Sequence, residues 1–155
     1  MSAPKTPNLE EGKLIRDIDF QILICKEKIR NHQESIKKVK KMSGMNGPLG
    51  IGAIDYSGMP RAGFSHMDFP DALMSIAKAE EAIEKERESI RELRRRRKNL
   101  VCAADRLEGA EQSIFVYRVI FGMTQDAAAD TIGISTRQLQ RIERKIRKCA
   151  DIFRL

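Results

Sequence analysis

The chain has 155 residues and a formal net charge of +7, from 29 lysines and arginines against 22 aspartates and glutamates. Charged residues make up 33% of the chain and aromatic residues only 5%, which favours long, surface-rich helices over a thick globular core. No apolar run approaches the roughly 18 residues of a membrane-spanning helix, and the polar N-terminus lacks the apolar stretch of a signal peptide. We therefore expect an N-terminal tail over residues 1–12 and no membrane association.

Catalytic and metal-binding motifs are the next features that the sequence argues against. The three cysteines, Cys25, Cys102 and Cys149, lie far apart and form no CxxC pair, which disfavours disulfides and zinc sites and favours the reduced cytoplasm. Only His32 and His66 could serve a histidine-based site, and no nucleotide-binding, hydrolase or metalloprotease signature is present. We expect a cytoplasmic protein that is not an enzyme and uses no cofactor or metal.

The first periodic segment runs from Leu14 to about Met42. Apolar residues recur there every three and four positions over nearly four heptads, and charged residues lie outside this stripe. Such an a/d pattern predicts a long helix with one apolar face. The stripe consists of Ile15, Ile18, Ile22, Cys25, Ile29, His32, Ile36 and Val39.

A second periodic segment runs from Asp71, its predicted N-cap, to about Leu107. Its stripe has the same spacing and is interrupted by Glu86 and Arg97. The stripe consists of Ile76, Ala79, Ile83, Ile90, Leu93, Leu100, Ala104 and Leu107. Two stripes of similar length predict an antiparallel coiled-coil helical hairpin over residues 13–107, and the alternative is an intermolecular coiled coil.

Residues 43–70 connect the two predicted helices and are rich in glycine and proline. This composition cannot hold a helix, and a connection of this length without regular structure is unusually long. The loop also contains apolar side chains, among them Ile54, Tyr56 and Phe64. It therefore either packs back on the hairpin or folds onto a partner protein.

Three shorter helices are predicted over residues 108–155. They are Ala110–Phe121, Gln125–Ile132 and a third that runs from Ser135 to about Phe153. Gly122 ends the first helix, Thr124 caps the second and Ser135 caps the third.

The spacing within the last two helices is typical of a helix-turn-helix. Counting from Gln125, the fifth position is Ala129, where two helices approach closely, and the ninth is Gly133, where the turn needs a positive φ. Four further positions that would bury the inner faces are apolar, namely Ile132, Ile134, Leu139 and Ile142. Residues 108–155 are therefore predicted to form a helix-turn-helix DNA-binding domain.

The third of these helices would meet DNA with the residues that its inner face does not use. Arginine forks match the edge of guanine, glutamine can pair with adenine, and lysine suits phosphates. The last 21 residues contain seven lysines and arginines against two acidic residues, as expected for a footprint on nucleic acid. The predicted DNA-binding residues are Ser135, Thr136, Arg137, Gln138, Gln140, Arg141, Arg144, Lys145 and Lys148. A second basic run, Arg94–Lys98, is either a solvated face or a source of auxiliary phosphate or partner contacts.

Residues Phe115–Thr124 (FVYRVIFGMT) and Gly133–Arg141 (GISTRQLQR) resemble region 4 of bacterial sigma-70 factors. They also resemble the ArpU/RinA-type late transcriptional regulators encoded by phages of Gram-positive bacteria. The resemblance implies an N-terminal helical part, a sigma-like helix-turn-helix that reads the major groove, and host RNA polymerase as a partner. No equivalent of the sigma region that reads the −10 element is recognisable, which favours an auxiliary activator over a complete sigma factor.

Together these features predict an all-α, sequence-specific DNA-binding transcriptional regulator in the cytoplasm of a bacterial host cell. The resemblance makes it a phage or prophage late-gene activator that binds double-stranded DNA. A homodimer is expected, because paired modules could reach half-sites about one helical turn apart. Two alternatives are a non-catalytic protein that binds polymerase or another regulator, and a small DNA-packaging accessory subunit.

Overall fold

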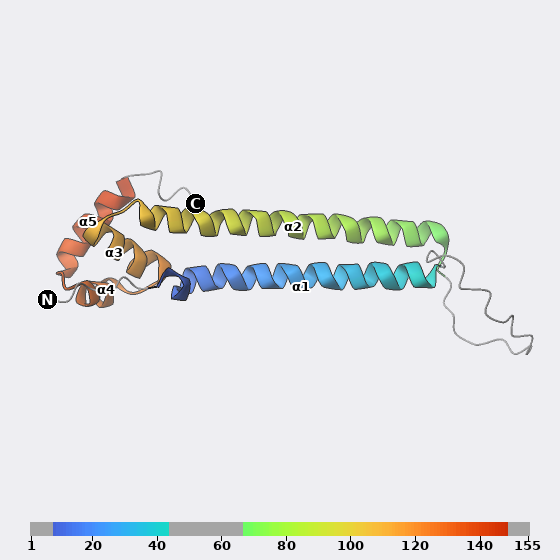
Figure 1. Cartoon of the computed structure of the whole chain (residues 1–155), viewed down its shortest axis with the longest axis horizontal. Helices are drawn as coiled ribbons and strands as arrows, with labels where there is room; N and C mark the ends of the chain where they lie inside the picture. Colours follow the sequence, from blue (N-terminus) through green and yellow to red (C-terminus); the bar gives the residue numbers. More distant parts are fainter. Residues whose placement is uncertain (1–7, 44–66, 149–155) are drawn as a thin grey trace, which may run out of the picture. The chain divides into compact units, whose positions relative to one another are not determined.

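The computed structural model describes residues 8–43 and 67–148, and all regular structure in these two ranges is helical (Figure 1). The elements in chain order are η1 (Leu9–Glu11), α1 (Lys13–Met42), α2 (Phe69–Asp105), α3 (Gly109–Phe115), η2 (Val116–Ile120), α4 (Gln125–Ile132) and α5 (Thr136–Lys148). The predicted all-α class is confirmed. Within the described ranges, none of the helices combines the length and the apolar character that crossing a membrane requires.

The contacts of the chain divide into two units. The first contains the described parts of Met1–Leu23 and Ile90–Leu155, and the second contains those of Ile24–Ser89. In each unit a stretch of α1 lies beside a stretch of α2, as Figure 1 shows. The helical hairpin is therefore formed within one chain, as the two matching stripes predicted.

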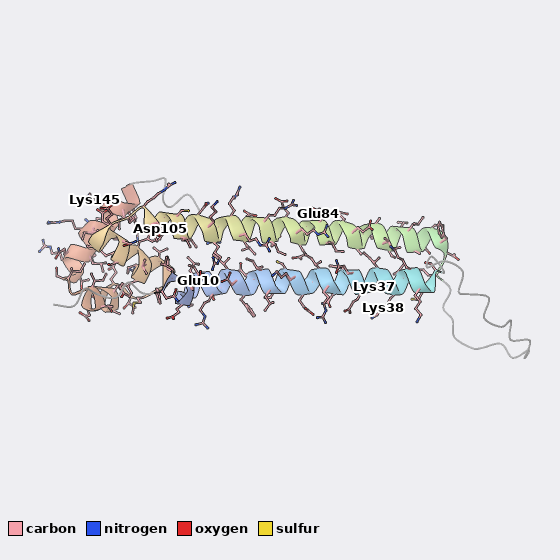
Figure 2. The ribbon with its side chains drawn as sticks, viewed as in Figure 1. Glu10, Lys37, Lys38, Glu84, Asp105 and Lys145 are labelled. Carbon is pink, nitrogen blue, oxygen red and sulfur yellow. The ribbon has the colours of Figure 1, made fainter. Side chains whose placement is uncertain are left out.

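The apolar stripe of α1 faces α2 and is most buried in the first unit. Ile15 and Ile18 are 0% and 2% exposed there, whereas Ile29 and Ile36 in the second unit are only half-buried. The difference follows from what surrounds each stretch. Two paired helices cannot enclose a side chain on all sides, but in the first unit the shorter helices add further cover. Charged side chains such as Lys37 lie outside the stripe and are exposed, as the side chains in Figure 2 show.

Helix α2 begins at Phe69, two residues before the predicted start. The prediction that Asp71 is the N-cap is therefore wrong, and Asp71 lies within the first turn instead. The Ala72 N–H donates to the Asp68 carbonyl at 2.9 Å, so the helical bonding pattern already starts at Asp68. Pro70 fits this first turn because it has no N–H to satisfy and its fixed φ suits a helix. Loop residues 44–66, including those predicted to fold onto the hairpin or a partner, lie outside the described residues.

Glu86, the first polar interruption of the α2 stripe, is paired with α1 in the second unit. It accepts a hydrogen bond from Lys28 Nζ at 3.1 Å and another from the Cys25 thiol. These two bonds, that from Cys25 first, lower the pKa of Glu86 below its ordinary value. Burial raises the pKa of Cys25, and the hydrogen bond and charge of Glu86 raise it further. A carboxylate on the seam is therefore tolerated because α1 supplies it with a cation and a donor.

Arg97, the second interruption, plays the same part in the first unit. Its Nε lies 3.2 Å from Asp19 Oδ1 on α1, and its Nη2 pairs with Glu10 in η1. Its neighbours in the basic run Arg94–Lys98 are all exposed. The seam thus uses one arginine of the run and leaves the other four cations on the solvent face.

Gly12 joins η1 to α1 at a point of close contact with η2. A Cβ on Gly12 would lie 2.2 Å from Ile120 Cγ2 and 3.2 Å from the Ile120 carbonyl oxygen. No side chain larger than hydrogen fits in this space without moving Ile120, which is itself fully buried. The start of α1 is thereby set directly against the short helices of the same unit.

Candidate nucleic-acid interface

Helix α3 continues directly into a wider π-helical turn, η2. The predicted single helix over residues 110–121 is therefore correct in place but not in regularity. The Phe121 N–H donates to the Val116 carbonyl at 2.9 Å, five residues back, instead of four. Gly122, with φ of 70°, then ends the segment as predicted. The buried side chains Phe115, Val116 and Ile120 of this stretch form the floor on which α4 and α5 pack.

The connection from α4 to α5 has the predicted cap residues and turn. The Thr124 hydroxyl accepts from the Ala127 N–H at 3.3 Å, and the Ser135 hydroxyl accepts from the Gln138 N–H at 3.2 Å. Gly133 has φ of 80°, a conformation that side-chain-bearing residues adopt only with strain. These caps end α4 and start α5 at defined residues, so the direction of α5 is set by local chemistry.

The inner face of α5 is apolar and packs against α3 and α4. Leu139 is 0% exposed and Ile146 is 3% exposed, while Ile142 between them is half-buried. Ala129 of α4 is 1% exposed, in agreement with the predicted close approach at this position. Ile146 was not among the predicted core residues, although its place seven residues after Leu139 could have identified it.

The outer face of α5 carries Arg137, Arg141 and Arg144, which we call the arginine stripe. Their spacing of four and three residues places them on one face of the helix, opposite Leu139 and Ile146. All three are exposed, and their guanidinium groups make no ion pair or hydrogen bond with the residues that the structure describes. Gln138 is exposed beside the stripe. Lys148 is the last helical residue, and its side chain lies outside the described part of the structure.

Three other predicted contact residues bond within the domain. Besides Ser135, which caps α5, Thr136 donates its hydroxyl proton to Asp126 Oδ1 of α4 at 3.0 Å. Lys145 Nζ donates to Glu111 Oε1 of α3 at 3.1 Å, although the lysine side chain is 75% exposed. These contacts tie both ends of α5 to the neighbouring helices.

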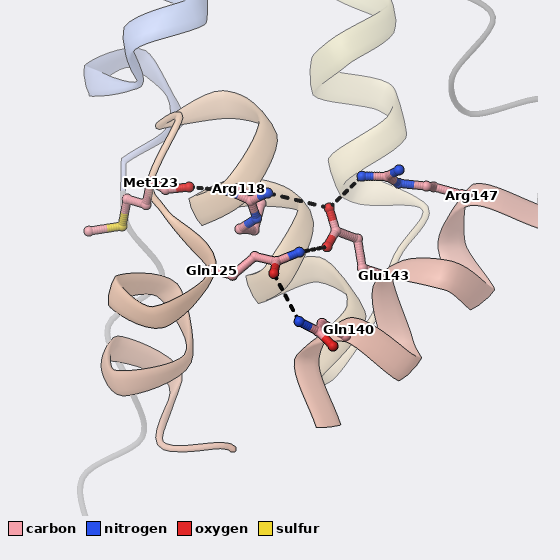
Figure 3. A network of polar contacts seen from close by, with 6 residues as sticks. All are labelled: Arg118, Met123, Gln125, Gln140, Glu143 and Arg147. Carbon is pink, nitrogen blue, oxygen red and sulfur yellow. Dashed lines mark hydrogen bonds and ion pairs between the residues drawn. The ribbon is translucent and has the colours of Figure 1, made fainter. Parts of the chain in front are cut away.

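Gln140, predicted to face outward, is half-buried and belongs to a polar network around Glu143 (Figure 3). Gln140 Nε2 donates to Gln125 Oε1 at 3.1 Å, and Gln125 Nε2 donates to Glu143 Oε2 at 3.0 Å. Arg147 Nη2 donates to Glu143 Oε1 at 3.0 Å, and Arg118 Nη2 of η2 lies 3.6 Å from the same oxygen. One carboxylate thus joins η2, α4 and α5.

The charge of Glu143 is maintained despite its burial. Its side chain is only 13% exposed, and this burial by itself would raise its pKa. The hydrogen bonds from Arg147 and Gln125 and the charges of Arg118 and Arg147 outweigh the burial, so that the pKa lies below its ordinary value. Arg118 also donates to the Met123 carbonyl, which holds the segment between η2 and α4. The sequence gave Glu143 no assigned role, because its partners come from three separate elements.

Comparisons with known proteins do not assign this chain to a family. No family model, curated protein or solved structure matches it. The resemblance to sigma-70 region 4 and to ArpU/RinA-type regulators therefore stays a prediction. The arginine stripe and the network that supports it are the features from which a function can be inferred.

Proposed function

We propose that this chain is a sequence-specific, non-catalytic DNA-binding regulator of transcription, with α4 and α5 acting as a helix-turn-helix. The observation that carries the proposal is the arginine stripe. Arg137, Arg141 and Arg144 are three exposed cations on one helix face, and the described residues give them no counter-charge. Nearby Lys145 and Arg147, in contrast, already pair with Glu111 and Glu143.

The chemistry of the stripe suits the major groove of DNA. An α-helix fits this groove, and a guanidinium can donate two parallel hydrogen bonds to O6 and N7 of guanine. Arg137 lies in the first turn of α5, where helix-turn-helix proteins place base-reading residues. Gln138 follows it and offers an amide that matches adenine. Later cations on the same face would then lie closer to the phosphates, which position the helix without reading sequence.

The polar network supports this proposal because a reading helix must be held in one orientation. Glu143 and Gln125 connect the inner edge of α5 to α4, and Arg118 connects it to η2. Thr136 fixes the first turn of α5 to Asp126. Side chains presented from a helix braced in this way lose little conformational freedom on binding, which favours specific over non-specific recognition.

The resemblance to phage regulators extends the proposal to a biological setting. A late-gene activator of a phage or prophage, working with host RNA polymerase in the bacterial cytoplasm, would use such a module to bind upstream of a promoter. We propose double-stranded DNA and this polymerase as partners. A homodimer would double the number of base contacts, because one module makes few.

The test is selection of binding sites from random duplexes, followed by anisotropy titration of the selected duplex against a scrambled one. Specific sites are bound about 10³-fold or more tightly than non-specific DNA at physiological salt. Arg137→Ala and Arg141→Ala are each expected to cost about 1–3 kcal/mol of binding free energy. Arg147→Ala is the matched control, since it removes a cation from another face of the same helix and should leave affinity within about twofold.

Two results would contradict the proposal. One is a failure to select any sequence, with weak and strongly salt-dependent binding that reflects phosphate attraction alone. The other is equal loss of affinity in Arg137→Ala and Arg147→Ala, which would show that net charge and not the stripe determines binding. Circular dichroism of each variant separates lost contacts from lost folding.

A further inference from the structure

Helix α1 has a second apolar face that α2 does not cover. Phe20 and Leu23 are 62% and 60% exposed and lie three residues apart, so their side chains are neighbours on the helix surface. Within the first unit they line a shallow groove together with Phe121 and Arg16. Single exposed apolar residues are ordinary, but adjacent large ones beside a groove are typical of a surface that meets another protein.

Charged residues flank this apolar pair in a symmetric order. Arg16 lies four residues before Phe20, and Glu27 lies four residues after Leu23. Because α1 is one continuous helix, spacings of four, three and four place all four residues on one face, which we call the docking stripe. The side chain of Arg16 is exposed and makes no ion pair with the described residues. Glu27 is 56% exposed and contacts only Arg30, at 3.6 Å on its own helix.

We propose that the docking stripe binds the docking stripe of a second copy of this chain, with the two α1 helices antiparallel. The two-fold axis would pass between Gln21 and Ile22. Phe20 then faces the partner's Leu23, Arg16 faces the partner's Glu27, and each contact occurs twice. The interface is thus self-complementary, as an interface on a two-fold axis must be.

The charge order selects both the occupant and its direction. A parallel pair in register would set Arg16 against the partner's Arg16 and Glu27 against the partner's Glu27, and like charges in contact oppose association. The antiparallel pair turns both repulsions into attractions and keeps the apolar residues together. The proposal goes beyond DNA binding, because it concerns self-association of the free protein and names the face that produces it.

The test is sedimentation of the full chain without DNA, over nanomolar to high micromolar concentrations. The wild type is expected to be a dimer in the micromolar range. Arg16→Glu alone and Glu27→Arg alone should each raise the dissociation constant by about tenfold or more, since each creates two like-charge contacts. An equimolar mixture of these two variants should associate again as a heterodimer, because every charged contact between the unlike chains is then attractive. Lys78→Glu, an exposed charge reversal on α2, is the control and should change nothing.

Leu23→Ser tests the apolar part of the stripe against Leu73→Ser, which removes a similar leucine that is 48% exposed on α2. Only the former should dissociate the dimer. A wild type that stays monomeric at high micromolar concentration would overturn the proposal and assign the face to a different protein. A dimer that survives Leu23→Ser, or charge variants that do not associate on mixing, would also overturn it. Circular dichroism confirms that each variant is folded, and none of these results depends on whether the chain binds DNA.

Discussion

Glu143→Ala is the substitution that tests most directly whether the polar network holds α5 in place. The wild-type carboxylate is 13% exposed and contacts Arg147 at 3.0 Å, Gln125 at 3.0 Å and Arg118 at 3.6 Å. Alanine removes all three contacts at once. It also leaves the Arg118 side chain, which is 23% exposed, without its only printed counter-charge among the described residues.

The cost can be built up from these contacts. The bond from Arg147, whose side chain is 67% exposed, is worth about 0.5 kcal/mol or less. The buried bond to Gln125 contributes roughly 1 kcal/mol, and stranding the Arg118 charge costs about 1–2 kcal/mol more. Alanine returns a few tenths of a kcal/mol through its higher helix propensity. We expect a net loss of about 2–3 kcal/mol in the free energy of unfolding.

Urea unfolding followed by circular dichroism measures this loss, with Arg147→Ala as the control at about 0.5 kcal/mol or less. Glu143→Gln should cost about 1 kcal/mol, because it keeps an acceptor and loses the charge. A loss below about 0.5 kcal/mol in Glu143→Ala would refute the reasoning and show that apolar packing alone orients α5.

The same residue gives a pH dependence with a defined sign. Because its pKa is lowered in the folded state, Glu143 contributes stability above the ordinary carboxyl pKa, and this contribution disappears as the pH falls through the folded value. The stability difference between wild type and Glu143→Gln should therefore shrink between about pH 5 and pH 3. A difference that is constant over this range would contradict the assignment of a stabilised carboxylate.

Two further predictions concern glycines and a thiol. Gly12→Ala should cost about 1–3 kcal/mol in unfolding free energy because its Cβ would lie 2.2 Å from Ile120 Cγ2, whereas Gly133→Ala should cost about 1 kcal/mol from its φ alone, since nothing lies within 4 Å of that Cβ. Urea unfolding checks both, and a neutral Gly12→Ala would show that the contact yields freely. Cys25 should react slowly with a disulfide reagent at pH 8 in a chain whose other cysteines are serine, because burial and Glu86 raise its pKa. Glu86→Gln should accelerate the reaction, and an unchanged rate would mean that burial alone protects the thiol.

Local chemistry explains why the end of the chain could be predicted so closely. The bounds of α4, the caps at Thr124 and Ser135 and the positive φ of Gly133 all depend on residues within a few positions of each other. The same is true of the arginine stripe, whose common face follows from helical spacing. By contrast, Asp71 was predicted as a cap from residue type alone, while Pro70 allowed the helix to start earlier.

Features that join distant segments could not be read from the sequence. The stripes predicted a hairpin and marked Glu86 and Arg97 as interruptions, but a shift by one heptad leaves the apolar pattern intact. The register that pairs Arg97 with Asp19 is therefore visible only in three dimensions. The same holds for the π-turn of η2 and for Glu143, because both depend on the packing of separate elements.

The pairing of the first helix with the end of the second has a consequence during synthesis of the chain. Asp19 leaves the ribosome about 80 residues before its partner Arg97, which at 5–20 residues per second is a delay of roughly 4–16 s. Helices form within microseconds, so α1 is complete while its isoleucine stripe has nothing to cover it. On a polysome, neighbouring nascent chains would present the same bare stripe to each other during this interval. The hairpin thus folds under competition with nascent-chain association, and a molecular chaperone that shields α1 would favour the correct pairing.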